Sequence, residues 1–450
     1  MKPWLFALVC AGAMAPGMRG AAFQADAQVV VIANPHVIAS ADRPPQRRDR
    51  VVIERGRIAC IGSVSQCPVP GDAHVIEARG KWVTPGLIDA HVHIGQLPVE
   101  EAERIAPLYL AFGTTTVRDT GGYPDVLRRL RAGFDSGRSI GPRLFAAARP
   151  LDGDPSKWAG LPDVARRVRT EDDVVDAIAE AKRDGADFIK LYGGLSRELL
   201  MASIAEAHRQ GLKTTADLME WEDTGTVDAL VTAGLDAFEH NIPEHYGRWE
   251  RDAPRFRALV PLLVREHVAV TWTLTLIDRP ATNRSPATAP TFLAMSPAQR
   301  RATEDMWHDH KVSEATRTWY AAVWPTAICN AARLFHRSGG VSLAGTDSPW
   351  YCCLPGDLLE ELQHLVTCGL PPSAALAAAT INPASWLGAT DLGALRVGAA
   401  ADLLVLDGNP LDDIRNIRRI AYVVSRGTVW KPADLVALAN RPAPAGPRRH

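Results

Sequence analysis

The sequence lacks the basic stretches of a nucleic-acid-binding protein and the cysteine spacing of a zinc-ribbon protein. Its 450 residues carry 50 Lys and Arg against 51 Asp and Glu, a formal net charge of -1, and no stretch is strongly basic. Nucleic-acid-binding proteins carry a basic patch or stripe, so nucleic acid is not expected as a partner. The seven cysteines lack the spacing of a structural zinc site. A hydrophobic content of 46% with 22% charged residues is typical of a globular protein.

The chain also has few long hydrophobic runs, and the one at the N-terminus is short. Lys2 precedes the apolar run "WLFALVCAGAMA", which falls short of the ~20 residues that a membrane helix needs. Small residues follow, and "ADA" before Gln28 resembles a cleavage site, with "RGA" before Ala22 as a second candidate. We therefore predict a signal peptide at 1–27 and a periplasmic or secreted mature protein without a membrane span. The alternative is an uncleaved anchor or a buried N-terminal helix.

Cysteine usage is compatible with export. Removing the predicted signal leaves an even number of cysteines, which permits disulfides in an oxidising compartment. These six are Cys60, Cys67, Cys329, Cys352, Cys353 and Cys368. Cys60 and Cys67 flank the short loop "IGSVSQ" and are the best candidate pair. Alternatively, all six are small buried hydrophobic side chains.

The hydrophobic pattern divides the chain into a long α/β segment between two β segments. Residues 28–84 and 385–433 read as short strands broken by Gly, Pro and charged turns. Residues 85–384 contain eight short apolar runs, among them "GLIDAHVHIG", "ADFIKLYGG" and "VSLAGTDS", with amphipathic helix patterns between several of them. This pattern predicts a (β/α)₈ TIM-type barrel inserted in a small β-sandwich domain built from both chain ends. The Pro-rich tail, 434–450, is expected to be disordered.

One connection is unusually long. The segment from Leu276 to Val323 is rich in Pro and Thr and then becomes helical with several Trp residues. Long connections in compact domains are usually functional or disordered. The aromatic content favours a lid or a wall of a substrate pocket.

Polar residues stand at the ends of several predicted strands. In a parallel barrel the active site lies at the C-terminal ends of the strands. His91 and His93, two apart on one strand, can point to the same side. The residues collected in this way are His91, His93, Lys190, Asp217, His240 and Asp347. Nitrogen and oxygen ligands that converge at one barrel mouth predict a divalent metal site.

The chain resembles the amidohydrolase superfamily, in its imidazolonepropionase-like and prolidase-like branch. The resemblance rests on "GKWVTPGLIDAHVH", "GTTTVRDTGG", "FIKLY", "GLDAFEHN", "AGTDS", "AAATINPASWLG" and "GAAADLLVLDGNPLDDI". It implies that His91, His93 and Asp347 hold one metal ion and that Lys190, N6-carboxylated, bridges to a second ion held by His240. Zinc is the default ion, and Mn, Fe or Ni would fit the same donors. The implied reaction is hydrolysis of an amide or dipeptide-like C–N bond, with Asp347 as general base and acid.

The chain departs from this branch at one position. Asp217 in "KTTADLM" stands where the branch carries a histidine. Asp217 can itself be a ligand, so that one or two ions are bound with a harder donor set. Alternatively it pairs with an unmodified Lys190, and the protein works with one metal as a deaminase or cyclic-amide hydrolase. In a third interpretation the site is degraded and the chain is a periplasmic binding protein.

The substrate is expected to be a small amide or dipeptide-like molecule. Arg118 and Tyr192 lie near strand ends and could bind a carboxylate or the oxyanion. Trp272, on the seventh predicted strand, suggests an apolar group beside the scissile bond. Self-association into a homo-oligomer is left open by the sequence.

Overall fold

The computed structural model describes residues 29–156, 158, 163–218, 224–240, 257–309, 313–324, 326–350 and 352–441. The predicted signal peptide and the last part of the predicted tail lie outside these residues. Within them, no helix is long and apolar enough to cross a membrane.

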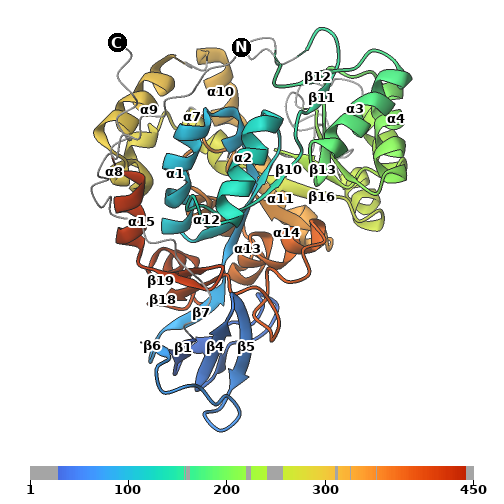
Figure 1. The fold of residues 1–450 in the computed structure, drawn as a ribbon. Coiled ribbons are helices and arrows are strands. Elements are labelled where there is room, and N and C mark those ends of the chain that lie inside the picture. The colour runs from blue at the N-terminus through green and yellow to red at the C-terminus, as the bar shows by residue number, and fades with distance from the viewer. Residues whose placement is uncertain are drawn as a thin grey trace, which may run out of the picture.

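Two antiparallel-rich sheets form the lower end of the molecule (Figure 1). One sheet has the order β5-β4-β1-β6 and the other β20-β19-β18-β7-β2-β3. Buried side chains of both sheets, such as Ile32, Val51, Val83 and Leu403, belong to one hydrophobic cluster. The strands are β1 (Val30–Ala33), β2 (His36–Val37), β3 (Gln46–Arg47), β4 (Arg50–Glu54), β5 (Arg57–Gly62), β6 (His74–Glu77), β7 (Trp82–Pro85), β18 (Leu403–Leu406), β19 (Ile420–Ser425) and β20 (Thr428–Trp430).

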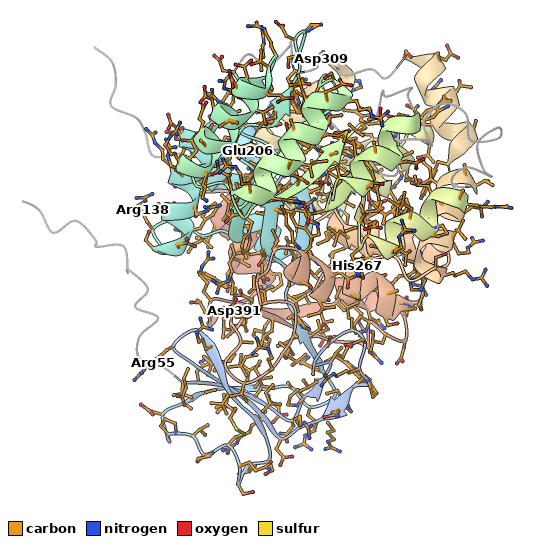
Figure 2. The ribbon with its side chains drawn as sticks, turned by 90° about the vertical axis from the view of Figure 1, so that its right-hand side faces the viewer. Arg55, Arg138, Glu206, His267, Asp309 and Asp391 are labelled. Carbon is orange, nitrogen blue, oxygen red and sulfur yellow. A yellow bond between two sulfur atoms is a disulfide. The ribbon has the colours of Figure 1, made fainter. Side chains whose placement is uncertain are left out.

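The two ends of the chain meet in the second sheet. Strand β7 from the N-terminal part pairs antiparallel with β18 from the C-terminal part, with Val83 opposite Val405. Backbone pairing therefore joins the N-terminal and C-terminal parts of the chain in one sheet. In Figure 2, Asp391 lies between this region and the helical body. Asp391 forms an ion pair of 3.4 Å with Arg57 of β5.

The central part of the chain is α/β with parallel sheets, as predicted. One sheet has the order β10-β9-β8, and the other has the order β12-β11-β13-β14-β15-β16-β17. Its strands are β8 (Leu87–Val92), β9 (Thr114–Asp119), β10 (Arg143–Ala146), β11 (Leu151–Asp152), β12 (Arg166–Arg167), β13 (Phe188–Tyr192), β14 (Lys213–Asp217), β15 (Ala237–Glu239), β16 (Ala269–Trp272) and β17 (Ser342–Ala344). Most are buried along their whole length, which explains their apolar runs.

Backbone hydrogen bonds also link the two parallel sheets at two places. The amide of Asp187, just before β13, donates to the carbonyl of Ala146 at the end of β10 (2.8 Å). At the second place, the amide of Asp347, just after β17, donates to the carbonyl of His91 on β8 (2.8 Å). This second link brings the end of the last strand beside the end of the first.

Helices lie between the parallel strands and cover them. Helix α3 shows why: Thr170 and Asp173 form a capping box, and Val174, Ala177, Ile178 and Ala181 form one buried stripe. The helices of this part include α1 (Val99–Ala111), α2 (Pro124–Asp135), α3 (Glu171–Arg183), α4 (Arg197–Arg209), α5 (Thr224–Thr232), α11 (Thr326–Arg337), α12 (Leu358–Thr367), α13 (Pro372–Ala378) and α14 (Ile381–Trp386).

The long connection after β16 is mostly helical in its described residues. It contains α7 (Leu274–Ala281), α8 (Pro290–Ala294), α9 (Pro297–Asp309) and α10 (Glu314–Val323). Arg279 of α7 is fully buried and bonds both carboxylate oxygens of Asp357, next to α12. This pair fixes the start of the connection against the body of the protein.

The tail prediction needs a correction at its start. Residues expected to be disordered from 434 onward instead form most of α15 (Pro432–Ala439). Leu435 and Ala439 are fully buried, and Ala439 packs in a cluster with Ile105 and Leu108 of α1. Apolar side chains at helical spacing give this segment a face to bury, which the Pro-rich composition beyond it obscured.

Two disulfides are present in the part of the chain that the structure describes. Cys60 and Cys67 are joined, in agreement with the predicted pair, and Cys329 is joined to Cys368. Cys352 and Cys353 are buried free thiols.

Candidate metal centre

Three predicted ligands converge at the ends of β8 and β17. The Nε2 atoms of His91 and His93 lie 3.3 Å apart, and Oδ1 of Asp347 lies 3.2 Å from each of them. All three residues are buried. Asp347 reaches this position because its backbone adopts a left-handed φ of 64° directly after the strand. His91, His93 and Asp347 are thus placed as one cluster, able to offer one donor atom each to a metal ion.

The hydrogen bonds to Nδ1 of each imidazole determine which ring nitrogen has a lone pair for a metal ion. Nδ1 of His91 lies 2.7 Å from a carboxylate oxygen of Glu239, and Nδ1 of His93 lies 2.9 Å from the carbonyl oxygen of Gly121. Both partners are acceptors, so both Nδ1 atoms donate and both Nε2 atoms of the neutral rings present lone pairs. Two lone pairs and a carboxylate oxygen then face one another at contact distance. A cation or an added proton must relieve this repulsion, and the donor set suits a divalent metal.

A second cluster lies beside the first and contains Lys190, Asp217 and His240. Oδ2 of Asp217 is 3.4 Å from Nζ of Lys190 and 3.2 Å from Nε2 of His240. Nδ1 of His240 lies 3.0 Å from Oγ1 of Thr273. The ring centroids of His240 and His91 are 4.4 Å apart, so the two clusters are in direct contact.

Asp217 is the electrostatic centre of this second cluster. Burial raises its pKa, but the charges of Lys190 and His240 outweigh burial and hold the pKa below its usual range. Asp217 is therefore an anion that touches both neighbours. Its position is compatible with a ligand role and equally with an ion pair to Lys190.

Glu239 is a residue of the site that the sequence analysis missed. Its carboxylate contacts Nδ1 of His91, the guanidinium of Arg118 and the hydroxyl of Thr215, all in the buried interior. In an extended strand, Glu239 and its neighbour His240 would point to opposite sides. The left-handed φ of 65° at His240 breaks this alternation, so both face the site. An acid directly before a predicted ligand was the only available signal.

Arg118 and Trp272 do not line the site, which corrects their prediction as substrate-binding residues. The guanidinium of Arg118 has no exposed surface and stacks over the rings of Phe188 and Trp386 (5.1 and 4.5 Å). Trp272 is equally buried and donates from Nε1 to Ser342, on the side that faces Phe335 of α11. Because both side chains are fully buried and contact other protein groups, neither presents a surface to a substrate.

Tyr192 does lie at the site, where it was expected. Its hydroxyl hydrogen-bonds the carboxylate of Asp217, and burial with this contact raises its pKa well above the usual value. Its ring packs edge-on against Trp158 (5.4 Å), which in turn lies 5.9 Å from the ring of His93. Two aromatic side chains therefore border the metal cluster.

A second group of potential metal ligands has a different explanation. Asp278 of α7 approaches Glu360 and His364 of α12. Arg284 lies 2.5 Å from Asp278, and Arg279 lies 2.6 Å from Glu360. Two guanidinium groups already neutralise these carboxylates, so this group is a buried ion-pair network.

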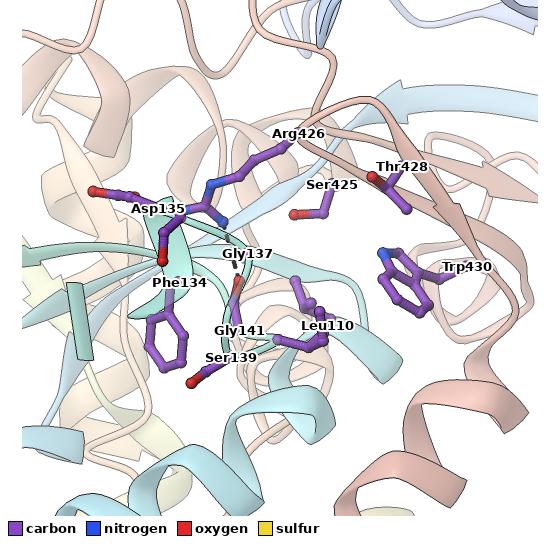
Figure 3. Close-up of a pocket in the computed structure, with 12 residues that line it drawn as sticks. Leu110, Phe134, Asp135, Gly137, Ser139, Gly141, Ser425, Arg426, Thr428 and Trp430 are labelled. Atoms are coloured by element: carbon purple, nitrogen blue, oxygen red, sulfur yellow. Dashed lines mark hydrogen bonds and ion pairs between the residues drawn. The ribbon is translucent and has the colours of Figure 1, made fainter. Parts of the chain in front are cut away.

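A small cavity lies at the opposite end of the parallel strands (Figure 3). Its volume is about 150 Å³, and it is lined by residues from α2 and the loop before β10 together with Ser425, Arg426 and Trp430. Arg426 is its cationic group, and this side chain already donates to the carbonyl of Gly141 and to Asp135. The cavity shares no residue with the metal clusters.

Comparison with known proteins agrees with this architecture. A model of the amidohydrolase family matches residues 82–430. An uncharacterised protein of Mycobacterium tuberculosis is 27% identical over 388 residues, covering 82% of this chain and 90% of that protein. An enamidase from Eubacterium barkeri is 44% identical over 224 residues, covering 47% of this chain and 56% of the enamidase.

The solved structures include a similar fold. That of a putative prolidase from Bifidobacterium longum superposes with a TM-score of 0.71 at 25% identity, covering 91% of this chain and 98% of the prolidase chain. Since the family model spans well over half of the sequence, the chain belongs to the amidohydrolase family and is a hydrolase that acts on carbon–nitrogen bonds.

Proposed function

We propose that this protein is an exported, metal-dependent hydrolase that cleaves an amide or peptide-like C–N bond in a small molecule. The observation that carries this proposal is the convergence of His91 Nε2, His93 Nε2 and Asp347 Oδ1 within 3.3 Å, with both Nδ1 atoms engaged elsewhere. A bound divalent ion, zinc by default, would supply Lewis acidity and a water of lowered pKa. His91, His93 and Asp347 would hold this ion.

Asp347 is proposed as the general base and acid. One of its carboxylate oxygens faces the two imidazoles, and the other remains able to take a proton from the attacking water and deliver it to the leaving nitrogen. Contacts with His91 and His93 lower its pKa well below the usual value despite burial, which raises it. The group is therefore ionised at neutral pH, as a general base must be before it takes a proton.

We propose that Asp217 and His240 hold a second ion, with N6-carboxylated Lys190 as the bridge. An unmodified ammonium has no lone pair to offer a metal, whereas a carbamate offers two oxygens. Oδ2 of Asp217 lies 3.2 Å from Nε2 of His240 and 3.4 Å from Nζ of Lys190. Only small movements of these side chains would therefore be needed to surround an ion.

A single-metal enzyme, such as a deaminase or cyclic-amide hydrolase, is the second candidate. The contact between Lys190 Nζ and Asp217 favours it, because an ion pair would use the lysine and the carboxylate together. A degraded binding site is a weaker candidate, since five of the six expected ligands are retained in this sequence.

The substrate class is proposed from the walls of the site. Tyr192 and Trp158 offer an apolar border beside His93. The similar proteins named enamidase and putative prolidase support amide and dipeptide-like substrates such as N-acyl amino acids and Xaa-Pro dipeptides. Periplasmic or secreted location, a closed eight-stranded barrel and a β-sandwich of the two sheets built from the chain ends complete the proposal. The two disulfides and the backbone hydrogen bonds between the parallel sheets support it.

The deciding experiment is metal content per chain, measured on the purified mature protein and on Asp217→His, with hydrolysis of N-acyl amino acids and Xaa-Pro dipeptides assayed in parallel. Two equivalents in the wild type with amide hydrolysis would support the two-metal proposal. One equivalent that rises to two in Asp217→His would replace it with the single-metal alternative. Absence of tightly bound metal and of turnover after metal addition would reject both.

A further inference from the structure

Two neighbouring cysteines in the loop after Asp347 take part in neither of the two disulfides. Of the six cysteines in the described residues, four are paired, and Cys352 and Cys353 are the remaining two. Their Sγ atoms lie 3.1 Å apart, and neither residue has any exposed surface. The two thiols therefore have each other as their nearest sulfur partner.

The side chains that pack in one hydrophobic cluster with this pair are apolar. Leu276 of α7 packs with both cysteines, and Trp307 and Trp350 pack against this cluster. Among the described residues, neither cysteine belongs to a group of three potential metal ligands. A soft-metal site is therefore not indicated, because two thiolates alone would leave the ion undercoordinated.

The loop that carries the pair is held at both ends. The amide of His93 donates to the carbonyl of Ser348 (2.8 Å), and Trp350 and Cys353 exchange two backbone hydrogen bonds of 3.0 Å. Beyond the pair, the amide of Leu354 donates to Asp357 (2.6 Å). Arg279 also donates to the carbonyl of Cys352. A bond between the two sulfurs would add a covalent constraint between two adjacent residues of this anchored loop.

We propose that Cys352 and Cys353 form a vicinal disulfide in the mature protein, which stiffens the loop between Asp347 and α12. In its formation the two thiols lose two protons and two electrons, and the disulfide of an oxidising partner, a small-molecule disulfide or a dithiol oxidoreductase, is reduced to two thiols. The proposal requires an oxidising compartment and does not depend on the reaction proposed above.

The bond is expected to form during folding and then to persist. Thiolate is the reactive form in disulfide exchange, and burial raises the pKa of the Cys353 thiol well above its usual value. Once the loop is covered, neither oxidant nor reductant has access. The pair is therefore a fixed structural element of the site and not a redox switch.

The first test is a count of thiols in the full-length protein purified from the periplasm of a secreting host. The chain is denatured with iodoacetamide and without reductant, and its peptides are mapped by mass. The expected result is a peptide with unmodified Cys352 and Cys353 that is lighter by two hydrogens. Two alkyl groups on this peptide, or bonds from it to Cys329 or Cys368, would overturn the proposal.

The second test separates this pair from an ordinary stabilising disulfide. Cross-links stabilise mainly by constraining the unfolded chain, and more so for longer loops. Cys329→Ser with Cys368→Ser, which releases a separation of 39 residues, should lower the Tm by several degrees. Cys352→Ser with Cys353→Ser should change the Tm little but speed amide hydrogen exchange at Leu354 severalfold. Unchanged exchange at Leu354 would refute the stiffening role.

Discussion

The carboxylate of Glu239 lies 2.7 Å from Nδ1 of His91, on the side of the ring opposite the metal cluster. Arg118 and Thr215 hold the other carboxylate oxygen. A partner of this kind fixes the tautomer and the orientation of a ligating imidazole. Glu239 is accordingly a positioning residue for His91, and Arg118 acts through Glu239.

Replacing Glu239 with Gln should weaken metal binding by about 10–100-fold, because the amide no longer fixes Nε2 of His91 as the lone-pair atom. Competition with a coloured chelator measures this affinity without any substrate. Thr215→Val is the matched control, since it removes one contact to the same carboxylate and leaves the contact to His91. Equal affinities in the wild type and Glu239→Gln would refute the positioning role.

Removing the base should stop hydrolysis and leave the fold intact. Asp347→Asn keeps the shape of the side chain but cannot accept a proton, and His91→Ala removes a donor atom from the cluster. Asp347→Asn should have less than about one hundredth of wild-type kcat/KM, the range expected for lost general base catalysis. His91→Ala should lose turnover through weakened metal binding. Circular dichroism and the Tm provide the folding control. Retained turnover in either variant would exclude the proposed chemistry.

Replacing Arg118 should lower the free energy of unfolding more than replacing a surface arginine. Arg118→Met leaves Glu239 as a buried carboxylate without its cation, which costs about 3–5 kcal/mol. Arg128→Met is the control, because its side chain is about half exposed in its ion pairs with Asp125 and Asp184, and it should cost about 0–1 kcal/mol. Urea unfolding of both metal-free variants measures the difference, and a similar cost for the two would contradict the buried-pair account.

Acid should destabilise the metal-free protein partly through Asp217. Burial raises the pKa of this carboxyl, but Lys190 and His240 together hold it below its unfolded value. The folded state therefore binds fewer protons than the unfolded chain, and this stability is present above the unfolded pKa and is lost as the pH falls below about 4. Asp217→Asn should lose less unfolding free energy than the wild type between about pH 6 and pH 3. Parallel pH profiles for the two proteins would contradict the ion-pair contact.

Much of the molecule follows from local pattern. Short runs that are apolar on both faces indicated buried parallel strands, and amphipathic stretches such as Glu171–Arg183 indicated the covering helices. Strand-end residues could be collected in order because parallel strands all end on the same side. For this reason His91, His93 and Asp347 were identified together. The short loop between Cys60 and Cys67 likewise pointed to their disulfide.

Tertiary structure decided what local pattern cannot encode. Whether Arg118 faces a substrate or a buried carboxylate depends on which side chain meets it in the interior, and that partner, Glu239, is 121 residues away in sequence. The left-handed backbone at His240 and Asp347 turns side chains against the alternation of a strand, which periodicity alone cannot reveal. Sequence thus determined which chemical groups stand at the strand ends, and packing determined which of them touch, because long-range contacts set both burial and charge pairing.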